Sequence, residues 1–251
     1  MTAAVAECAA CRLAYQTPRP SLEASLAYME MRWRSQDTYV GDPEHQRARA
    51  AKQLELLALV APAGARVLDF GAGIGTFVRA AGAAGWDARG IERSAAARER
   101  AARENGVELQ ADLADAPGAF DVVTMWDVVE HLRDPRAVVE SLRARLRPGG
   151  SMIFETANWE SWGRLALGDV WGLFLFDHQY YFSPASLQAL LEGAGLGDFR
   201  LLPVDEVRLA GPPSPAEGAA AQAQWAAYLR AAALWPEHAT INILVAAARA
   251  R

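Results

Sequence analysis

The chain has few of the features that mark several protein classes. It has 251 residues but only two cysteines, which argues against the disulfide framework of a secreted domain. No apolar run reaches the ~20 residues that a bilayer span needs, and no signal peptide is recognisable. We therefore predict a cytoplasmic protein with no membrane partner.

Positive charge is also scarce. Lys and Arg number 25 against 30 Asp and Glu, which gives a net charge of -5. Binding a phosphate backbone needs a basic face, so a nucleic acid is not the expected partner. The remaining composition, 52% hydrophobic and 22% charged, is that of an ordinary globular chain with one substantial core.

The two cysteines stand together in Cys8-Ala-Ala-Cys11, which has the spacing of half a zinc site. A structural zinc ion needs four ligands, and the sequence has no second pair of this kind. The alternative is two free thiols near the N-terminus, and we predict no metal ligand.

Apolar runs and helical patterns alternate between residues 64 and 155. Strands are predicted at 66–70, 88–92, 107–111, 120–126 and 151–155, with helices at 76–84, 94–104 and 135–146. This alternation predicts an α/β fold, Rossmann-like and doubly wound, with helices on both faces of a parallel sheet. Two later strands, at 199–204 and 240–246, would bring the sheet to seven.

The rest of the chain surrounds this sheet. Residues 1–60 are predicted as a helical segment or lid, with helices at 22–35 and 44–60, and residues 61–251 as the main domain. A helix is also predicted at 219–233. Within the main domain, the aromatic-rich insertion 157–182 either walls a substrate pocket or fills a core of its own.

The first predicted strand runs into a turn with glycine at every second position, Gly71-Ala72-Gly73-Ile74-Gly75. Such a turn lets a ligand approach the backbone closely. In a dinucleotide-binding turn the third glycine would stand at Thr76. Asp69 precedes the turn and would repel a pyrophosphate but attract an amino group. These residues favour a nucleoside that carries an amino acid over a nicotinamide dinucleotide.

Asp69-x-Gly71-x-Gly73-x-Gly75 after an apolar strand resembles the cofactor motif of class I S-adenosylmethionine-dependent methyltransferases. The run 126–135, Trp-Asp-Val-Val-Glu-His-Leu-Arg-Asp-Pro, resembles the signature of small-molecule methyltransferases, including ubiquinone-pathway O-methyltransferases and sugar methyltransferases. Residues 146–150, Leu-Arg-Pro-Gly-Gly, are typical of the same superfamily. The resemblance implies S-adenosylmethionine as cofactor and a last strand antiparallel to the fifth.

Acidic residues at the predicted strand ends extend the cofactor site. Glu92 stands 21 residues after Gly71, where a carboxylate accepts ribose hydroxyls, although it would also suit a solvent-facing charge. The resemblance implies that Asp112 bonds the adenine, with Leu113 stacked nearby; helix capping is the alternative for Asp112. The predicted cofactor residues are Asp69, Gly71, Ala72, Gly73, Gly75, Phe77, Glu92, Arg93, Asp112, Leu113, Trp126, Asp127 and, from the lid, Tyr39.

Methyl transfer from a sulfonium is an in-line displacement, and a hydroxyl acceptor must lose a proton. Histidine suits that task because its pKa lies near the working pH. Of the four histidines, His131 and His178 stand in segments predicted at the carboxyl edge of the sheet. We predict one of them as general base and favour His178; a bond to a loop carbonyl is the alternative for His131.

The predicted function is thus methyl transfer to a small molecule, most readily at oxygen. In sugar C-methyltransferases the histidine is paired with a tyrosine three residues earlier, and here that position is Leu175. A sugar-nucleotide methyltransferase, a nicotinamide oxidoreductase and a non-catalytic binding protein remain alternatives, and a homodimer remains open beside a monomer.

Overall fold

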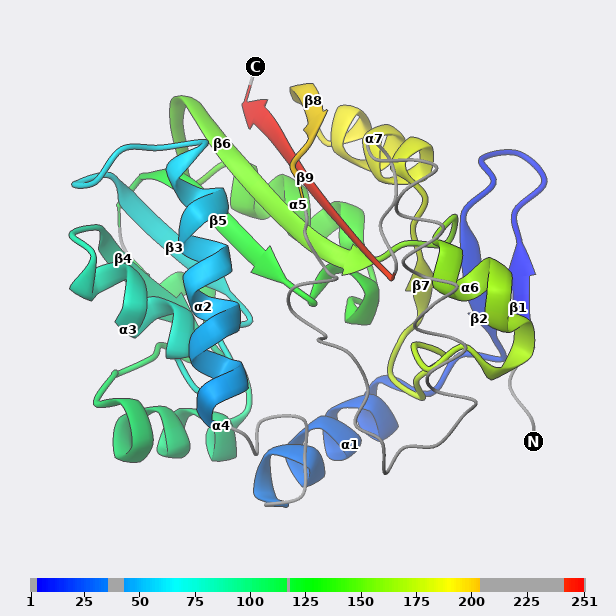
Figure 1. Ribbon diagram of the computed structural model, residues 1–251, viewed down its shortest axis with the longest axis horizontal. Coiled ribbons are helices and arrows are strands. Elements are labelled where there is room, and N and C mark those ends of the chain that lie inside the picture. The colour runs from blue at the N-terminus through cyan, green and yellow to red at the C-terminus, as the bar shows by residue number, and fades with distance from the viewer. Residues whose placement is uncertain (1–3, 36–42, 117, 204–241, 251) are drawn as a thin grey trace.

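The computed structural model describes residues 4–35, 43–116, 118–203 and 242–250 (Figure 1). The strands are β1 (Ala4–Glu7), β2 (Ala14–Thr17), β3 (Arg66–Phe70), β4 (Asp87–Ile91), β5 (Phe120–Trp126), β6 (Leu146–Ala157), β7 (Tyr180–Tyr181), β8 (Leu196–Leu201) and β9 (Ile243–Ala250). The α-helices are α1 (Leu22–Arg34), α2 (Pro43–Ala58), α3 (Thr76–Ala83), α4 (Ala95–Arg100), α5 (Pro135–Arg143), α6 (Trp162–Leu167) and α7 (Pro184–Gly193). Among these helices, none combines the length and apolar character of a membrane span.

The main sheet has the strand order β4-β3-β5-β6-β9-β8. Strands β3 to β6 run parallel, and β9 lies antiparallel between β6 and β8, as the resemblance implied. The chain first moves from β3 to β4 and then crosses back to β5 on the other side of β3. In parallel sheets a ligand crevice opens at such a reversal, outside the carboxyl ends of the strands.

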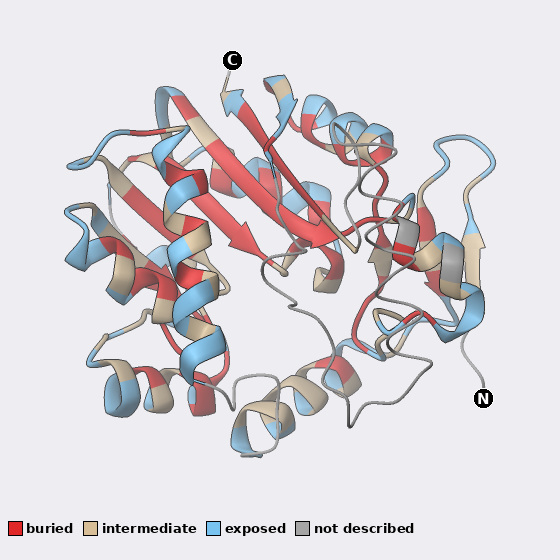
Figure 2. Ribbon diagram, viewed as in Figure 1, coloured by how far each residue is buried: buried red, intermediate tan, exposed pale blue. Residues whose placement is uncertain are grey.

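Alternate side chains of the strands feed two cores, because successive residues of a strand point to opposite faces. Val67 packs with residues of α2 and α3 on one face, whereas Leu68 packs with residues of α5 and α7 on the other. Figure 2 shows the central strands almost wholly buried between the helices. The doubly wound α/β fold is thereby confirmed.

A second, smaller sheet has the order β1-β2-β7. Its β1–β2 hairpin comes from the N-terminus, and β7 comes from the end of the insertion 157–182. Tyr15 pairs with Tyr180, and Ala14 pairs with Tyr181. The N-terminal hairpin and the end of the insertion are therefore joined by backbone hydrogen bonds.

Several boundaries differ from the sequence-based predictions. In the part of the chain described, the main sheet has six strands, because the predicted strand 107–111 forms only the single bridge between Ile91 and Gln110. β6 begins at Leu146, before the predicted Ser151, and β9 extends to Ala250. Residues 1–60 were predicted as helical, but a hairpin precedes the two helices. The helix predicted at 219–233 lies outside the described residues.

The insertion's aromatic residues mostly pack on one another. Trp171 and Tyr181 are 2% and 1% exposed and form a small core with Ala14 and Ala157. The ring centroids of Trp171 and Phe174 lie 5.3 Å apart. For these residues the structure agrees with the second interpretation, a core of the insertion's own.

Candidate active site

The glycine turn joins β3 to α3 where the strand order reverses. Gly71 and Gly73 have φ angles of 81° and 56°, a region that favours glycine. A Cβ on Gly71 would lie 2.5 Å from a methyl group of Val128, and one on Gly73 would lie 2.9 Å from the indole of Trp33. The turn therefore packs closely against α1 and against the loop that follows β5.

Glu92 fastens this turn from the end of β4. Its Oε2 accepts a hydrogen bond from the Gly73 N–H at 2.9 Å, and its Oε1 accepts one from the Ser94 N–H at 2.8 Å. The side chain is only 4% exposed. Burial raises the pKa of Glu92, and the two backbone N–H groups counteract that rise. The predicted ribose carboxylate thus lies directly against the glycine turn.

Asp69 is buried at the end of β3, with 2% of its surface exposed. The hydroxyl of Thr124, on the neighbouring strand β5, donates to Asp69 Oδ1 at 2.7 Å. Burial raises the pKa of Asp69 to about 7, against the lowering effects of Thr124 and Arg49. A cation arriving nearby would favour its ionised form, so attraction of an amino group stays a prediction.

Arg49 is a residue of the site that the sequence analysis missed. It reaches from α2 to the strand ends, where its Nη2 lies 2.6 Å from Asp127 Oδ2 and also contacts Glu155 Oε1. Asp127 follows β5 with a φ of 54°, unusual for a residue with a side chain. Arg49 gave no sequence signal, because its partners lie far along the chain on separate strands.

Helix α1 closes over the same region. Glu30 accepts hydrogen bonds from the Ser94 hydroxyl at 2.5 Å and from the Ala96 N–H at 3.3 Å, and so caps the start of α4. The Ser94 hydroxyl is the largest cause of a lowered pKa of Glu30. With Trp33 against Gly73, these contacts place α1 beside the glycine turn, and its role as a lid stays a prediction.

Two predicted cofactor residues, Phe77 in α3 and Trp126 at the end of β5, are packed in the core. Phe77 and Trp126 are 4% and 7% exposed, and their ring centroids are 5.3 Å apart. Both pack with α2 residues such as Leu57. The structure gives them a packing role, so a cofactor contact by either ring stays a prediction.

The other predicted cofactor residues lie nearer the surface. Asp112 is exposed and accepts a hydrogen bond from the Ala114 N–H at 3.0 Å, the capping role given as its alternative. Ala72 and Leu113 are half-buried, and Arg93 is exposed. Tyr39 lies outside the described residues.

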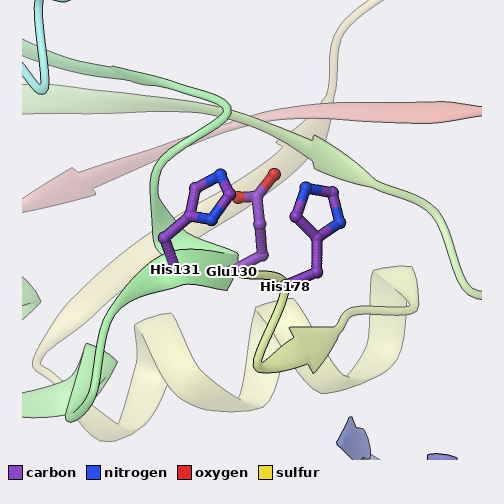
Figure 3. Close-up of side chains that lie close together, drawn as sticks. All are labelled: Glu130, His131 and His178. Atoms are coloured by element: carbon purple, nitrogen blue, oxygen red, sulfur yellow. The ribbon is translucent and has the colours of Figure 1, made fainter. Parts of the chain in front are cut away.

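The two predicted catalytic histidines lie close together (Figure 3). Ligand-type atoms of Glu130, His131 and His178 all lie within 4.8 Å of one another. Glu130 and His131 belong to the short helical turn Val129–His131 after β5, whereas His178 lies in the insertion. The Gln179 N–H donates to the Glu130 carbonyl at 2.8 Å, and the Gln179 amide donates to the His131 carbonyl at 2.9 Å. These bonds hold the two segments together.

Asp177 orients the His131 ring. Nδ1 of His131 lies 2.9 Å from the backbone carbonyl of Asp177, the loop-carbonyl bond given as an alternative for this residue. Because a carbonyl only accepts, Nδ1 carries the hydrogen and Nε2 keeps its lone pair in the neutral ring. Oδ2 of Asp177 lies 3.6 Å from Nδ1 and 3.2 Å from a guanidinium nitrogen of Arg32.

Burial sets the charge state of this cluster. His178 is 5% exposed, and desolvation, followed by the nearby His131, lowers its pKa to about 3. Glu130 is fully buried, and desolvation, followed by Asp127, raises its pKa well above the usual value. Thr156 lies near enough to oppose that rise, yet its hydroxyl is not placed for a hydrogen bond to the carboxyl.

Residues 43–198 match the family model described as a methyltransferase domain. This stretch is more than half of the chain, and the protein therefore belongs to the methyltransferase domain family. The match includes the glycine turn, Glu92 and the histidine-bearing turn after β5.

Curated relatives are ubiquinone biosynthesis O-methyltransferases. That of Idiomarina loihiensis is 32% identical over 155 residues, which cover 55% of this chain and 64% of the relative. That of Methylococcus capsulatus is 39% identical over 106 residues, which cover 38% of this chain and 45% of the relative. The chain thus spans less than two thirds of the length of these two relatives.

Solved structures resemble about nine tenths of the chain at lower identity. The magnesium protoporphyrin IX methyltransferase of Synechocystis, with bound S-adenosylhomocysteine, has a TM-score of 0.58 at 16% identity, covering 91% of this chain and 97% of that one. The N-methyltransferase NodS of Bradyrhizobium japonicum has a TM-score of 0.56 at 17% identity, covering 90% and 98%. Likeness at this level identifies the Rossmann-like fold.

Proposed function

We propose that the protein transfers the methyl group of S-adenosylmethionine to an oxygen atom of a small molecule. One contact carries the proposal: the glycine turn touches Val128 at Gly71, and the chain continues from Val128 directly into Glu130 and His131. A cofactor held by the turn therefore has its reactive end beside buried groups that can act on an acceptor.

The surrounding side chains suit the parts of this cofactor. Glu92, against the turn, accepts the ribose hydroxyls, as in other nucleoside-binding sheets. Arg49 and Asp127 form an ion pair at the strand ends and can exchange it for pairs with the cofactor's carboxylate and ammonium groups. Asp69 adds negative charge beneath them once it ionises.

A closely packed pair of imidazoles favours an acceptor that carries a hydroxyl. In the in-line step the acceptor oxygen bonds to the methyl carbon while the carbon–sulfur bond breaks, and the hydroxyl proton must leave. His131 is the better general base, because its Nδ1 hydrogen is fixed by Asp177 and its Nε2 is available. The low pKa of His178, about 3, makes that ring a weak base. The relatives are O-methyltransferases, which agrees with this choice of acceptor atom.

We place the acceptor beside helix α1, from the N-terminal segment 1–60, and the insertion 157–182, which meet at the ring contact of Tyr28 with Phe176, 5.0 Å between centroids. An apolar wall of this kind suits a small organic molecule. The main domain, 61–251, supplies the cofactor half.

Calorimetry with S-adenosylhomocysteine and with NAD tests the cofactor. We expect binding of the first alone, and a folded protein that binds only NAD would contradict the proposal. Labelled methyl transfer to a panel of phenols and sugar nucleotides tests the acceptor. His131→Gln should abolish turnover but preserve S-adenosylhomocysteine binding, with His45→Gln, an exposed histidine of α2, as the matched control.

A further inference from the structure

Two buried groups of the histidine cluster have no hydrogen-bond partner within the described residues. Both carboxyl oxygens of Glu130 and the Nδ1 atom of His178 are inaccessible to solvent and unpaired. Their side chains are 0% and 5% exposed. An unpaired buried polar group costs about 1–3 kcal/mol, and a charged one costs more. Packing alone therefore gives no reason for these atoms to be where they are.

Both rings lie beside the Glu130 carboxyl, and each has a ligand-type nitrogen within 4.8 Å of the other two donors. In His131 the hydrogen on Nδ1 is directed at the Asp177 carbonyl, which leaves the Nε2 lone pair. In His178, Nδ1 is buried and has no hydrogen-bond partner among the described residues. Metal-binding histidines commonly have one nitrogen fixed by a backbone carbonyl, as His131 has. Figure 3 shows the Glu130 carboxyl between the two rings.

From this geometry we infer that Glu130, His131 and His178 bind one divalent transition-metal ion. Two imidazoles and one carboxylate form a donor set that suits zinc or ferrous iron, whereas magnesium and calcium prefer oxygen ligands alone. Three protein ligands leave at least one position open. The ligand atoms are within 4.8 Å of one another, and binding would draw them together by roughly 1 Å, a shift open to side-chain rotation.

The ion explains the unpaired carboxylate, because a cation offsets the cost of burying it. The three ligands do not form a recognisable motif in the sequence. Glu130 and His131 are adjacent, but His178 comes from the insertion and approaches only through the bonds of Gln179. No spacing rule for metal ligands would therefore have found it.

The role of the ion rests on the proposed function. A hydroxyl bound at the open position loses its proton to solvent more readily, since the ion stabilises the resulting oxyanion. That oxyanion then takes the methyl group as the carbon–sulfur bond breaks. With the ion in place, His131 is a ligand, and the general base assigned to it above is no longer needed.

Metal titration of the full chain tests the site without relying on activity. Cys8 and Cys11 must first be replaced by serine, because free thiols also bind zinc. In this thiol-free protein, calorimetry with Zn²⁺ and visible absorption with Co²⁺ should each report one ion per chain. Glu130→Gln and His178→Gln should each weaken binding by at least about tenfold, whereas His45→Gln should leave it unchanged.

Binding of S-adenosylhomocysteine by the same metal-free samples separates this inference from the proposed function. Retained binding without any stoichiometric uptake of Zn²⁺ or Co²⁺ would overturn the metal site alone. Uptake that survives both Glu130→Gln and His178→Gln, in variants whose circular dichroism shows them folded, would overturn it as well. Loss of S-adenosylhomocysteine binding with metal uptake intact would instead count against the cofactor assignment.

Discussion

Glu92 and Gly73, from two separate strand ends, are joined by a hydrogen bond of 2.9 Å in which the glycine N–H donates to the buried carboxylate. This bond fixes the backbone of the turn before any ligand arrives. A site that is fixed in advance loses less conformational entropy on binding. The first prediction follows from it.

Glu92→Ala leaves the N–H groups of Gly73 and Ser94 without their buried acceptor. We expect a loss of about 2–4 kcal/mol in the free energy of unfolding and at least a tenfold weaker affinity for S-adenosylhomocysteine. Urea denaturation and calorimetry measure the two effects. Glu108→Ala, at an exposed glutamate, is the control and should change neither. Equal behaviour of both variants would refute the structural role of Glu92.

Gly73→Ala should abolish cofactor binding, because the new methyl group meets Trp33 and the φ of 56° is strained for alanine. Gly106 offers a matched control: its φ is 65°, but a Cβ there would meet nothing within 4 Å. Gly106→Ala should cost about 1 kcal/mol of stability through backbone strain and still bind S-adenosylhomocysteine. If Gly73→Ala binds as well as Gly106→Ala, the turn is not the cofactor site.

Arg49→Ala removes the guanidinium that pairs with Asp127 and Glu155. The KM for S-adenosylmethionine should rise at least tenfold, with a smaller fall in kcat, because under the proposed function Arg49 contacts the non-reacting end of the cofactor. Steady-state kinetics with Arg47→Ala, an exposed arginine of the same helix, provides the comparison. A fall in kcat with KM unchanged would place Arg49 elsewhere in the reaction.

Asp69 should make stability depend on pH in an unusual direction. Its pKa is raised to about 7 in the folded protein, so the folded state holds a proton that the unfolded state has already released. Stability contributed by this group is present at low pH and is lost as the pH rises toward 7. Relative to Asp69→Asn, the wild type should lose roughly 2–3 kcal/mol between about pH 5 and about pH 8.

Urea denaturation at several pH values measures the difference in stability between the wild type and Asp69→Asn. The other buried carboxyls are present in both proteins, so their contributions to the pH dependence cancel in this difference. Thr124→Val serves as a second comparison, since it removes the hydroxyl that lowers the pKa of Asp69. A stability difference from Asp69→Asn that stays constant between about pH 5 and about pH 8 would show that the carboxyl is already ionised in the folded protein.

The sequence analysis predicted the cofactor half well because its signals are local. A strand, a glycine turn and a helix follow one another within residues 66–83, and hydrophobic periodicity reports each of them. The prediction of a strand at 107–111 is wrong. This segment has a short apolar pattern, and its pairing depends on the edge strand β4, with which it forms only the bridge between Ile91 and Gln110.

The contacts that complete the site were missed because they join distant segments. Arg49 and Asp127 are 78 residues apart, and Glu30 and Ser94 are 64 apart. The N-terminal hairpin also lacked a signal, since its two strands of four residues are too short for a clear alternation. Such pairings depend on the assembled fold.

The small three-stranded sheet has a practical consequence for anyone handling this protein. The Gln16 N–H donates to the Gln179 carbonyl at 3.0 Å, so the β1–β2 hairpin is hydrogen-bonded to the immediate neighbour of His178. Deleting the hairpin to improve crystals, or fusing a bulky tag to a shortened chain, would remove the strand that pairs with β7 and the hydrogen bond to Gln179 beside His178. Expression designs should therefore keep the hairpin intact and carry any tag at the other end.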